Sequence, residues 1–286
     1  MTPSDTQAGA LAATPAATAV ATPLAGAVVA ARTTGTTSHI TAITSGKGGV
    51  GKTFVAANLA AALAAQGQRV LVLDADLGLA NLDVVLNLYP KITLHDVFTN
   101  KNTLAQAVLP APGGFSVLLA GSGMVEYSRL TPHLREQLQA VIEEIGPQFD
   151  RVLLDTGAGI SDVVLYTVSL AHEVMIVATP EPTSLTDAYA TIKVLANTQG
   201  RRKVQLVVNQ AGKATDGRHV RNQLQQVIDR YVTPTLDGAV HVELMGTLPS
   251  DPAVRDAVQR RQLLFINAPG TPASVAMGEM AARLLK

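Results

Sequence analysis

The chain has 286 residues, enough for one large domain or two modest ones, and 47% of them are hydrophobic, so a sizeable core is available. Its 22 basic and 22 acidic residues cancel, which excludes an overall charge that would attract nucleic acid or an anionic membrane. The absence of cysteine excludes disulfides, cysteine-ligated zinc and iron–sulfur clusters, and fits a cytoplasmic protein.

Residues 1–38 differ in composition from the rest of the chain. Ala, Thr, Pro and Gly fill this segment, and no charged residue occurs between Asp5 and Arg32. Because no periodic apolar face emerges, we predict a disordered tail. The segment does not fit a signal peptide, since a basic start is missing and Pro and Thr interrupt any apolar stretch. No run in the chain approaches the ~18 apolar residues of a membrane span.

Residues 46–53, Gly-Lys-Gly-Gly-Val-Gly-Lys-Thr, match the phosphate-binding loop G-x-x-x-x-G-K-[ST]. Glycines let successive backbone N–H groups converge on phosphate oxygens. Lys52 is then expected to reach the β- and γ-phosphates, and the Thr53 hydroxyl to ligate Mg²⁺. The apolar run 39–45 predicts a strand entering the loop, and 53–66 predicts a helix whose N-terminus faces the phosphates. The sequence therefore predicts a nucleoside triphosphate site.

From His39 onward, short apolar runs alternate with segments of helix length, which is typical of a mostly parallel sheet flanked by helices. The predicted strands are 39–45, 69–73, 115–119, 151–155, 173–178, 203–208 and 241–246. The predicted helices are 53–66, 131–145, 183–198, 217–231, 251–260 and 272–285. No repeat or linker follows residue 39, so we predict that 39–286 form a single α/β domain.

Acidic residues follow two of the predicted strands. Asp74 and Asp76 come directly after 70–73, and Asp155 follows 152–154. In open α/β sheets ligands bind at the carboxyl ends of the strands, where the phosphate loop also lies. A carboxylate there can hold the shell of Mg²⁺ or orient the attacking water. The residues alone do not decide which of Asp74 and Asp76 has which role.

Several motifs resemble those of the deviant-Walker ATPases, the family that contains MinD and ParA. A second loop lysine, Lys47, is that family's signature, and ordinary phosphate-loop kinases do not carry it. The other matching motifs are Asp-Ala-Asp-Leu-Gly-Leu-Ala-Asn-Leu-Asp at 74–83, Asp-Thr-Gly-Ala-Gly at 155–159, Thr-Pro-Glu-Pro at 179–182, Val-Val-Asn at 207–209 and Leu-Pro-Ser-Asp-Pro at 248–252. The resemblance covers residues 39–286 and implies the phosphate-loop fold of MinD.

The resemblance also implies a slow, switch-type ATP hydrolase with ATP and Mg²⁺ as cofactors. Lys47 would cross an ATP-bound homodimer to the partner's phosphates, and Asp76 would position or activate the water. Glu181 would reach the partner's ribose, and Asn209 would bind adenine. Asn81 and Asp83 would lie in the first switch loop. The implied nucleotide-binding residues are Gly46, Lys47, Gly48, Gly49, Val50, Gly51, Lys52, Thr53, Phe54, Asp155, Glu181, Asn209, Leu248, Pro249 and Ser250, and the metal-binding residues are Thr53, Asp76 and Asp155.

Within that family the chain resembles the flagellar-number regulators of the FlhG (FleN) group. The motifs that carry this resemblance are Gly-Leu-Ala-Asn-Leu-Asp at 78–83, Asp-Thr-Gly-Ala-Gly-Ile at 155–160 and Asp-Pro-Ala-Val-Arg-Asp-Ala-Val-Gln at 251–259. It implies an FlhF-type GTPase partner and a flagellar basal-body or transcription partner. The N-terminal GTPase-activating element of the group, Asp-Gln-Ala-x-x-Leu-Arg, is matched at Gln7, Ala8 and Leu11, but Thr6 precedes Gln7 and Ala12 replaces the arginine.

The end of the chain departs from the membrane-binding tail of these relatives. Residues 273–285 carry apolar side chains, but Arg283 and Lys286 are the bases at this end. Interfacial helices need apolar burial together with cationic attraction. We therefore predict a helix docked on the core, with membrane binding weak or absent.

Three classes of function remain compatible with these motifs. An ATP-dependent dimerisation switch for flagellar number or placement fits best. The alternative is a ParA-type partitioning ATPase for chromosomes, plasmids or cargo, which would need a basic face; its candidates are Arg201, Arg202, Lys203, Arg218, Arg221, Arg260 and Arg261. A metal or electron carrier on the same nucleotide fold lacks the cysteines that clusters need. No specific nucleic acid is predicted as a partner.

Overall fold

The computed structural model describes residues 38–121 and 125–286. The predicted tail, with its element around Gln7, lies outside the described residues except for Ser38. The side chain of Ser38 is buried, and the first strand begins at the next residue.

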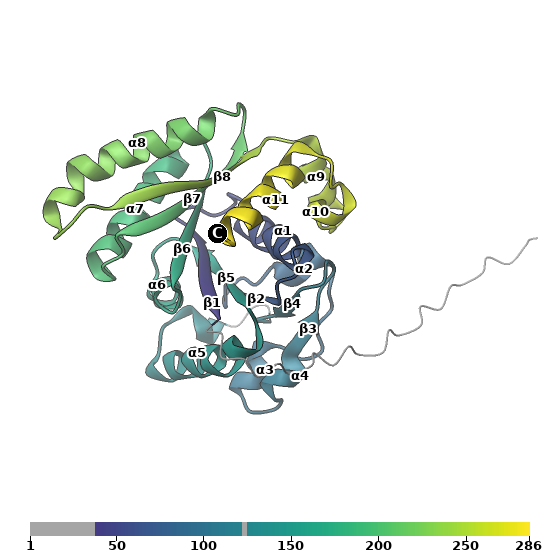
Figure 1. The fold of residues 1–286 in the computed structure, drawn as a ribbon. Coiled ribbons are helices and arrows are strands. Elements are labelled where there is room, and N and C mark those ends of the chain that lie inside the picture. Colours follow the sequence, from purple (N-terminus) through teal and green to yellow (C-terminus); the bar gives the residue numbers. More distant parts are fainter. Residues whose placement is uncertain (1–37, 122–124) are drawn as a thin grey trace, which may run out of the picture. The chain divides into compact units, whose positions relative to one another are not determined.

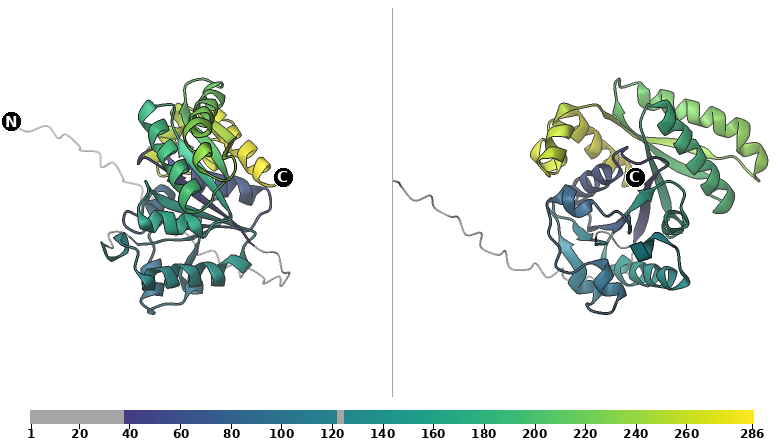
Figure 2. Two further views of the ribbon diagram at one scale, coloured as in Figure 1. Left: turned by 90° about the vertical axis from the view of Figure 1, so that its left-hand side faces the viewer. Right: turned by 180° about the vertical axis from the view of Figure 1, so that it is seen from behind.

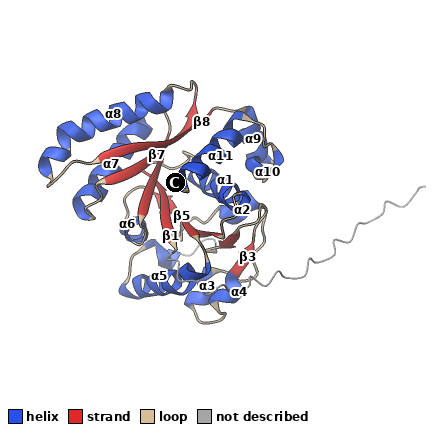
Figure 3. Ribbon diagram, viewed as in Figure 1, coloured by secondary structure: helices blue, strands red, loops and turns tan. Residues whose placement is uncertain are grey.

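The described residues contain an eight-stranded sheet in the order β3-β4-β2-β5-β1-β6-β7-β8 (Figures 1 and 3). Every neighbouring pair is parallel except β3 and β4. The strands are β1 His39–Ser45, β2 Val70–Ala75, β3 Val108–Pro110, β4 Ser116–Leu118, β5 Arg151–Ala158, β6 Glu173–Ala178, β7 Lys203–Ala211 and β8 His241–Pro249. The predicted class, a mostly parallel sheet flanked by helices, is confirmed.

Helices cover both faces of this sheet. They are α1 Lys52–Ala65, α2 Leu82–Leu86, α3 Leu94–Phe98, α4 Leu104–Ala107, α5 Pro132–Ile145, α6 Asp162–Ser169, α7 Pro182–Thr198, α8 Asp216–Tyr231, α9 Pro252–Gln259, α10 Leu264–Asn267 and α11 Pro272–Leu284. One core cluster joins the sheet to α5, α6, α7 and α8, and a second joins it to α1, α10 and α11. Figure 2 shows these two groups from the side and from behind. Because both faces are covered, the central strands β1, β2, β5 and β6 are buried over nearly their whole length, as is usual in a parallel sheet.

All the predicted strands and helices are present, with ends shifted by up to three residues. Helix α5 begins as predicted: Thr131 Oγ1 accepts a hydrogen bond from Leu134 N at 3.1 Å, and Pro132 occupies the first turn. The elements that the sequence did not predict are the short ones, β3, α2, α3, α4 and α10, together with α6. A segment of three to five residues is too short to show a periodic pattern.

The last helix, α11, packs on the core as predicted. Met277, Met280 and Leu284 are buried against α1 and β8, and Figure 1 shows α11 in yellow beside the purple α1. The guanidinium of Arg283 donates to Met245 O at 2.7 Å, and that of Arg151 donates to Leu284 O. Within 38–121 and 125–286, no helix is both long and apolar enough to cross a membrane.

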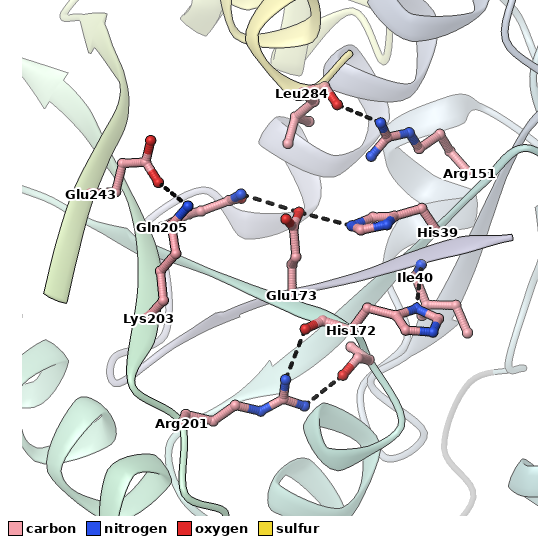
Figure 4. A network of polar contacts seen from close by, with 11 residues as sticks. His39, Ile40, Arg151, His172, Glu173, Arg201, Lys203, Gln205, Glu243 and Leu284 are labelled. Atoms are coloured by element: carbon pink, nitrogen blue, oxygen red, sulfur yellow. Dashed lines mark hydrogen bonds and ion pairs between the residues drawn. The ribbon is translucent and has the colours of Figure 1, made fainter. Parts of the chain in front are cut away.

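A network of polar side chains joins the first residues of the parallel strands, at the edge opposite the strand ends that carry Asp74 and Asp155 (Figure 4). His39 Nε2 lies 3.0 Å from Glu173 Oε2, and the rings of His39 and His172 stack with 5.5 Å between centroids. His172 Nδ1 accepts a hydrogen bond from Ile40 N at 3.0 Å. Because an accepting ring nitrogen carries no proton, this contact requires the neutral form of His172. Burial lowers the pKa of His172, and the charges of His39 and Arg201 lower it further while Glu173 opposes them.

We expect this histidine to make the fold less stable in mild acid. Because the folded-state pKa of His172 is lowered, the unfolded chain binds a proton first, and stability is lost as pH falls below ~6.5. In His172→Asn an amide oxygen can still accept from Ile40 N, but the position no longer titrates. Urea denaturation at pH 7.5 and 5.5 should therefore show a larger loss for the wild type than for His172→Asn. The exposed His133→Asn serves as control, and equal losses in wild type and His172→Asn would contradict the assignment.

Candidate functional site

The phosphate loop connects β1 to α1 at the carboxyl edge of the sheet. β1 lies between β5 and β6, so the loop emerges where the strand order reverses, which is the usual place for a ligand in this fold class. Gly49 and Gly51 have φ of 76° and 95°, a region that favours glycine. Gly51 caps α1 without a side-chain hydrogen bond. The first amides of α1 are therefore left for an anion.

Two glycines of the loop are also required by close packing. A Cβ on Gly46 would lie 2.2 Å from Asp187 O in α7, and one on Gly51 would lie 2.4 Å from Asn209 Nδ2. The loop thus holds its conformation against α7 and the end of β7.

Lys52 and Asp155 form the charged centre beside this loop. Both are buried, at 9% and 2% exposure. Burial lowers the pKa of Lys52, against the charges of Asp155 and Asp76. Burial raises the pKa of Asp155 to about 7, although the Thr53 hydroxyl donates to it and Lys52 lies near. A cation and a carboxylate buried together, each with a perturbed pKa, are typical of a functional site.

Of the three residues predicted to hold Mg²⁺, namely Thr53, Asp76 and Asp155, the last has surroundings that fit such an ion. Asp155 Oδ1 is buried and has no hydrogen-bond partner within the described residues, so it is available to a metal-bound water. In the part of the chain that the structure describes, no three His, Asp or Glu side chains gather closely enough to hold a metal. Mg²⁺ would therefore need phosphate oxygens to complete its coordination, as is usual for this ion.

Asp74 and Asp76 differ in their surroundings. Asp74 is 1% exposed, and its two carboxylate oxygens accept from Asp76 N and Leu82 N at 3.3 Å each. Burial, then the charge of Asp155, raises the pKa of Asp74 well above its usual range. Asp76 is less buried, and its Oδ1 accepts from Leu79 N at 3.3 Å. Asp74 therefore fixes both ends of the segment 76–82 from within the protein. Asp76, in contrast, faces a cavity.

That cavity has a volume of about 590 Å³, within the range of small-molecule sites. Its lining includes seven residues predicted to be functional, Gly48, Gly49, Gly51, Lys52, Thr53, Phe54 and Asp76, and also Asn81 from the predicted switch loop. The remaining lining residues are Leu79, Thr156, Gly157, Ala158, Ser161 and Val164. The first four belong to the motifs quoted at 74–83 and 155–159, which gave them no individual role, whereas no sequence signal pointed to Ser161 and Val164.

The residues predicted to contact adenine lie at the ends of β7 and β8. Asn209 Nδ2 donates to Val50 O at 2.8 Å, and Asn209 Oδ1 accepts from Gln210 N at 2.9 Å. Ser250 N donates to Ala211 O at 2.8 Å, which joins the two strand ends. The structure thus brings Asn209 to the phosphate loop, whereas Leu248, Pro249 and Ser250 do not line the 590 Å³ cavity. Their predicted contact with the base stays a prediction.

Lys47 lies apart from Lys52, on the exposed side of the loop. Its Nζ lies 3.0 Å from Glu181 Oε2 and 3.1 Å from Thr183 Oγ1. The side chains of Lys47 and Glu181 are 39% and 61% exposed. The two residues predicted to act on a partner's nucleotide therefore meet each other at the surface of one chain.

Comparisons with known proteins agree with this geometry. A family model described as ParA, NUBPL iron-transfer P-loop NTPase, matches residues 36–285. The chain is 40% identical to the antiactivator FleN of Pseudomonas aeruginosa, over 86% of both proteins. It is 30% identical to the flagellum site-determining protein YlxH of Helicobacter pylori, over 85% of this chain and 81% of that protein. It also resembles the structure of the septum site-determining protein MinD with Mg-ADP from Pyrococcus horikoshii, with a TM-score of 0.71, 28% identity, and coverage of 87% and 96%.

Proposed function

Because the chain belongs to the ParA and MinD family of P-loop ATPases, we propose that it is an ATP-dependent dimerisation switch that regulates the number or placement of flagella. The main observation in favour of the switch is that the two lysines of the phosphate loop lie in different surroundings. Lys52 is buried beside Asp155 in its own site, whereas the Lys47 side chain is exposed and, among the described residues, its amine contacts Glu181 and Thr183. A second lysine with its charge at the surface is best placed to act on the nucleotide of another copy.

The proposed roles follow from these positions. Lys52 and the amides at the start of α1 would bind the phosphates, and Thr53 and Asp155 would hold Mg²⁺, which stabilises charge on the phosphates when bound. Asp76, at the cavity wall, would orient the attacking water. Lys47 and Glu181 would contact the partner's nucleotide, and Asn209 its own adenine.

The flagellar role is supported by the names of two relatives, an antiactivator and a flagellum site-determining protein. An FlhF-type GTPase is the proposed partner. The partitioning alternative is less well supported, because three of its candidate bases are engaged within the chain. Arg201 donates to the carbonyls of Val168, Ala171 and His172, Arg202 donates to Ala196 O, and Lys203 pairs with Glu243 at 2.7 Å. Figure 4 shows Arg201 and Lys203 in these contacts.

The family model's description names an iron-transfer protein. The chain contains no cysteine, and iron–sulfur clusters are held by cysteine thiolates. We therefore do not extend that activity to this chain.

The switch is tested by measuring the molar mass of the protein in solution together with its rate of ATP turnover. Light scattering should detect a dimer with Mg-ATP and a monomer with Mg-ADP, since the γ-phosphate supplies the differential affinity. ATP turnover per protomer should rise with protein concentration until the dimer saturates. A rate per protomer that does not change with concentration would count against the switch. For the flagellar role, expression in Pseudomonas aeruginosa lacking FleN should change the number of flagella per cell relative to an empty vector.

A further inference from the structure

The carboxylate of Asp251 joins the start of α9 to the start of α11. Its Oδ1 accepts a hydrogen bond from Ala253 N at 2.9 Å, and its Oδ2 accepts one from Ala273 N at 3.3 Å. Each helix begins with a proline, which has no N–H, so these two amides are the first that the helices offer. The roles proposed for the motif 248–252 end at Ser250 and leave this carboxylate unassigned.

The contact with α11 satisfies an amide in buried surroundings. Ala273 is fully buried, and Thr271, which precedes the helix, makes no side-chain hydrogen bond to its first amides. The Thr271 hydroxyl donates to Ala268 O instead. Because a buried N–H without an acceptor costs free energy, the contact with Asp251 is expected to hold this end of α11 in place.

Asp251 also directly follows the segment 248–250, which is predicted to contact the base. Ser250 N donates to Ala211 O at 2.8 Å, so this segment is fixed to the end of β7, just after Asn209. On its other side, α11 packs against α1, the helix whose first amides are left for an anion. Figure 1 shows the C-terminal helices, in yellow, beside the purple α1. The carboxylate therefore lies between the base side and the phosphate side of the proposed site.

We propose that Asp251 is a positioning residue for the nucleoside. By holding α9 and α11 at once, its carboxylate would fix the segment 248–250 relative to the phosphate loop. A nucleotide whose phosphates lie at the start of α1 would then meet its base contacts already in place, and binding would not incur the cost of ordering that segment. This role rests on the proposed function, because it presupposes that Asn209 and the segment 248–250 face the base.

The use of both oxygens distinguishes this residue from an ordinary helix cap. Capping α9 alone needs a single acceptor, which Ser, Thr or Asn also supplies. The second acceptor, on α11, requires a carboxylate, because the amide nitrogen of asparagine can only donate. The side chain at position 251 therefore matches a contact with two helices better than a cap on one.

Calorimetry on the full chain with Mg-ADP and Mg-pyrophosphate tests this role, since both probes carry two phosphates and only one carries adenosine. The wild type should bind ADP more tightly, and the ratio of the two affinities measures the contribution of the nucleoside. Asp251→Ala should lower this ratio about threefold to thirtyfold, the equivalent of a lost helix cap, and leave the pyrophosphate affinity unchanged. A role confined to stability would leave the ratio as it is.

Two further variants serve as controls. Thr131→Ala removes the cap of α5 at Leu134 N, outside the nucleotide cavity, so it should lower the melting temperature but keep the wild-type affinity ratio. Asp251→Asn keeps one acceptor and loses the other. It should therefore be more stable than Asp251→Ala, while its ratio stays below the wild-type value. This variant keeps the test valid if Asp251→Ala fails to fold.

The possible failures are distinguishable from one another. A wild-type affinity ratio in folded Asp251→Ala or in Asp251→Asn would overturn the positioning role, and so would an equal loss of affinity for ADP and pyrophosphate. If the wild type binds pyrophosphate as tightly as ADP, the nucleoside is not recognised, and the positioning role fails while the phosphate site stands. If the wild type binds neither probe, the proposed function itself is refuted.

Discussion

Lys52→Ala should weaken Mg-ATP binding about tenfold or more, because it removes a charge-assisted contact of ~1.5–3 kcal/mol at the β- and γ-phosphates. The loss is expected to be large because this cation is already desolvated, at 9% exposure. The charge of Lys52 also compensates the negative charges of Asp155 and Asp76. Without Lys52, these two carboxylates face the nucleotide with their charges uncompensated. The glycines of the loop remain, so its backbone can still form.

Calorimetry with Mg-ATP measures this effect. Lys91→Ala, at an exposed position outside the cavity, removes the same charge elsewhere and should leave the affinity unchanged. A thermal melt should accompany both variants, since Lys52 is buried and its loss can alter stability as well. Wild-type affinity in a folded Lys52→Ala protein would show that the phosphates bind elsewhere.

The phosphate loop was predictable because its chemistry is local. The glycines, Lys52 and Thr53 are contiguous in the sequence, and the strand before them and the helix after them are long enough to show their periodicity. The parallel sheet was predictable for a related reason. Strands buried on both faces are mostly apolar, and helices of 14 residues or more separate several of them.

The distinction between Asp74 and Asp76 needed the folded chain. In sequence they are two acids after one strand, and only the hydrogen bonds from Asp76 N and Leu82 N show that Asp74 points into the protein. The contact of Lys47 with Glu181 joins residues 134 positions apart, and no local pattern encodes such a pair. Asp83 Oδ1 is buried without a hydrogen-bond partner among the described residues. This too depends on which side chains the fold brings near and is not visible in the local sequence.

Asp76→Ala and Lys47→Ala should separate hydrolysis from dimerisation. Asp76 lines the nucleotide cavity without belonging to the phosphate loop, so Asp76→Ala should keep ATP affinity, lower turnover about 10²–10⁴-fold, and accumulate the ATP-bound dimer. Lys47→Ala should lose both dimer and turnover, because the contact across the interface is gone. In the wild type, releasing Lys47 from Glu181 costs little, since an exposed ion pair contributes only ~0–1 kcal/mol.

Light scattering with ATP, and ATPase rates at several protein concentrations, distinguish these outcomes. Lys193→Ala, an exposed lysine of α7 on the same chain, is the matched control and should behave like the wild type in both assays. If Asp76→Ala fails to accumulate a dimer while Lys47→Ala still turns over ATP at the wild-type rate, the second lysine has no role across an interface. Hydrolysis would then have to be completed by the groups of one cavity, namely Lys52, Thr53, Asp76 and Asp155, and the exposed pair of Lys47 and Glu181 would be a surface contact alone.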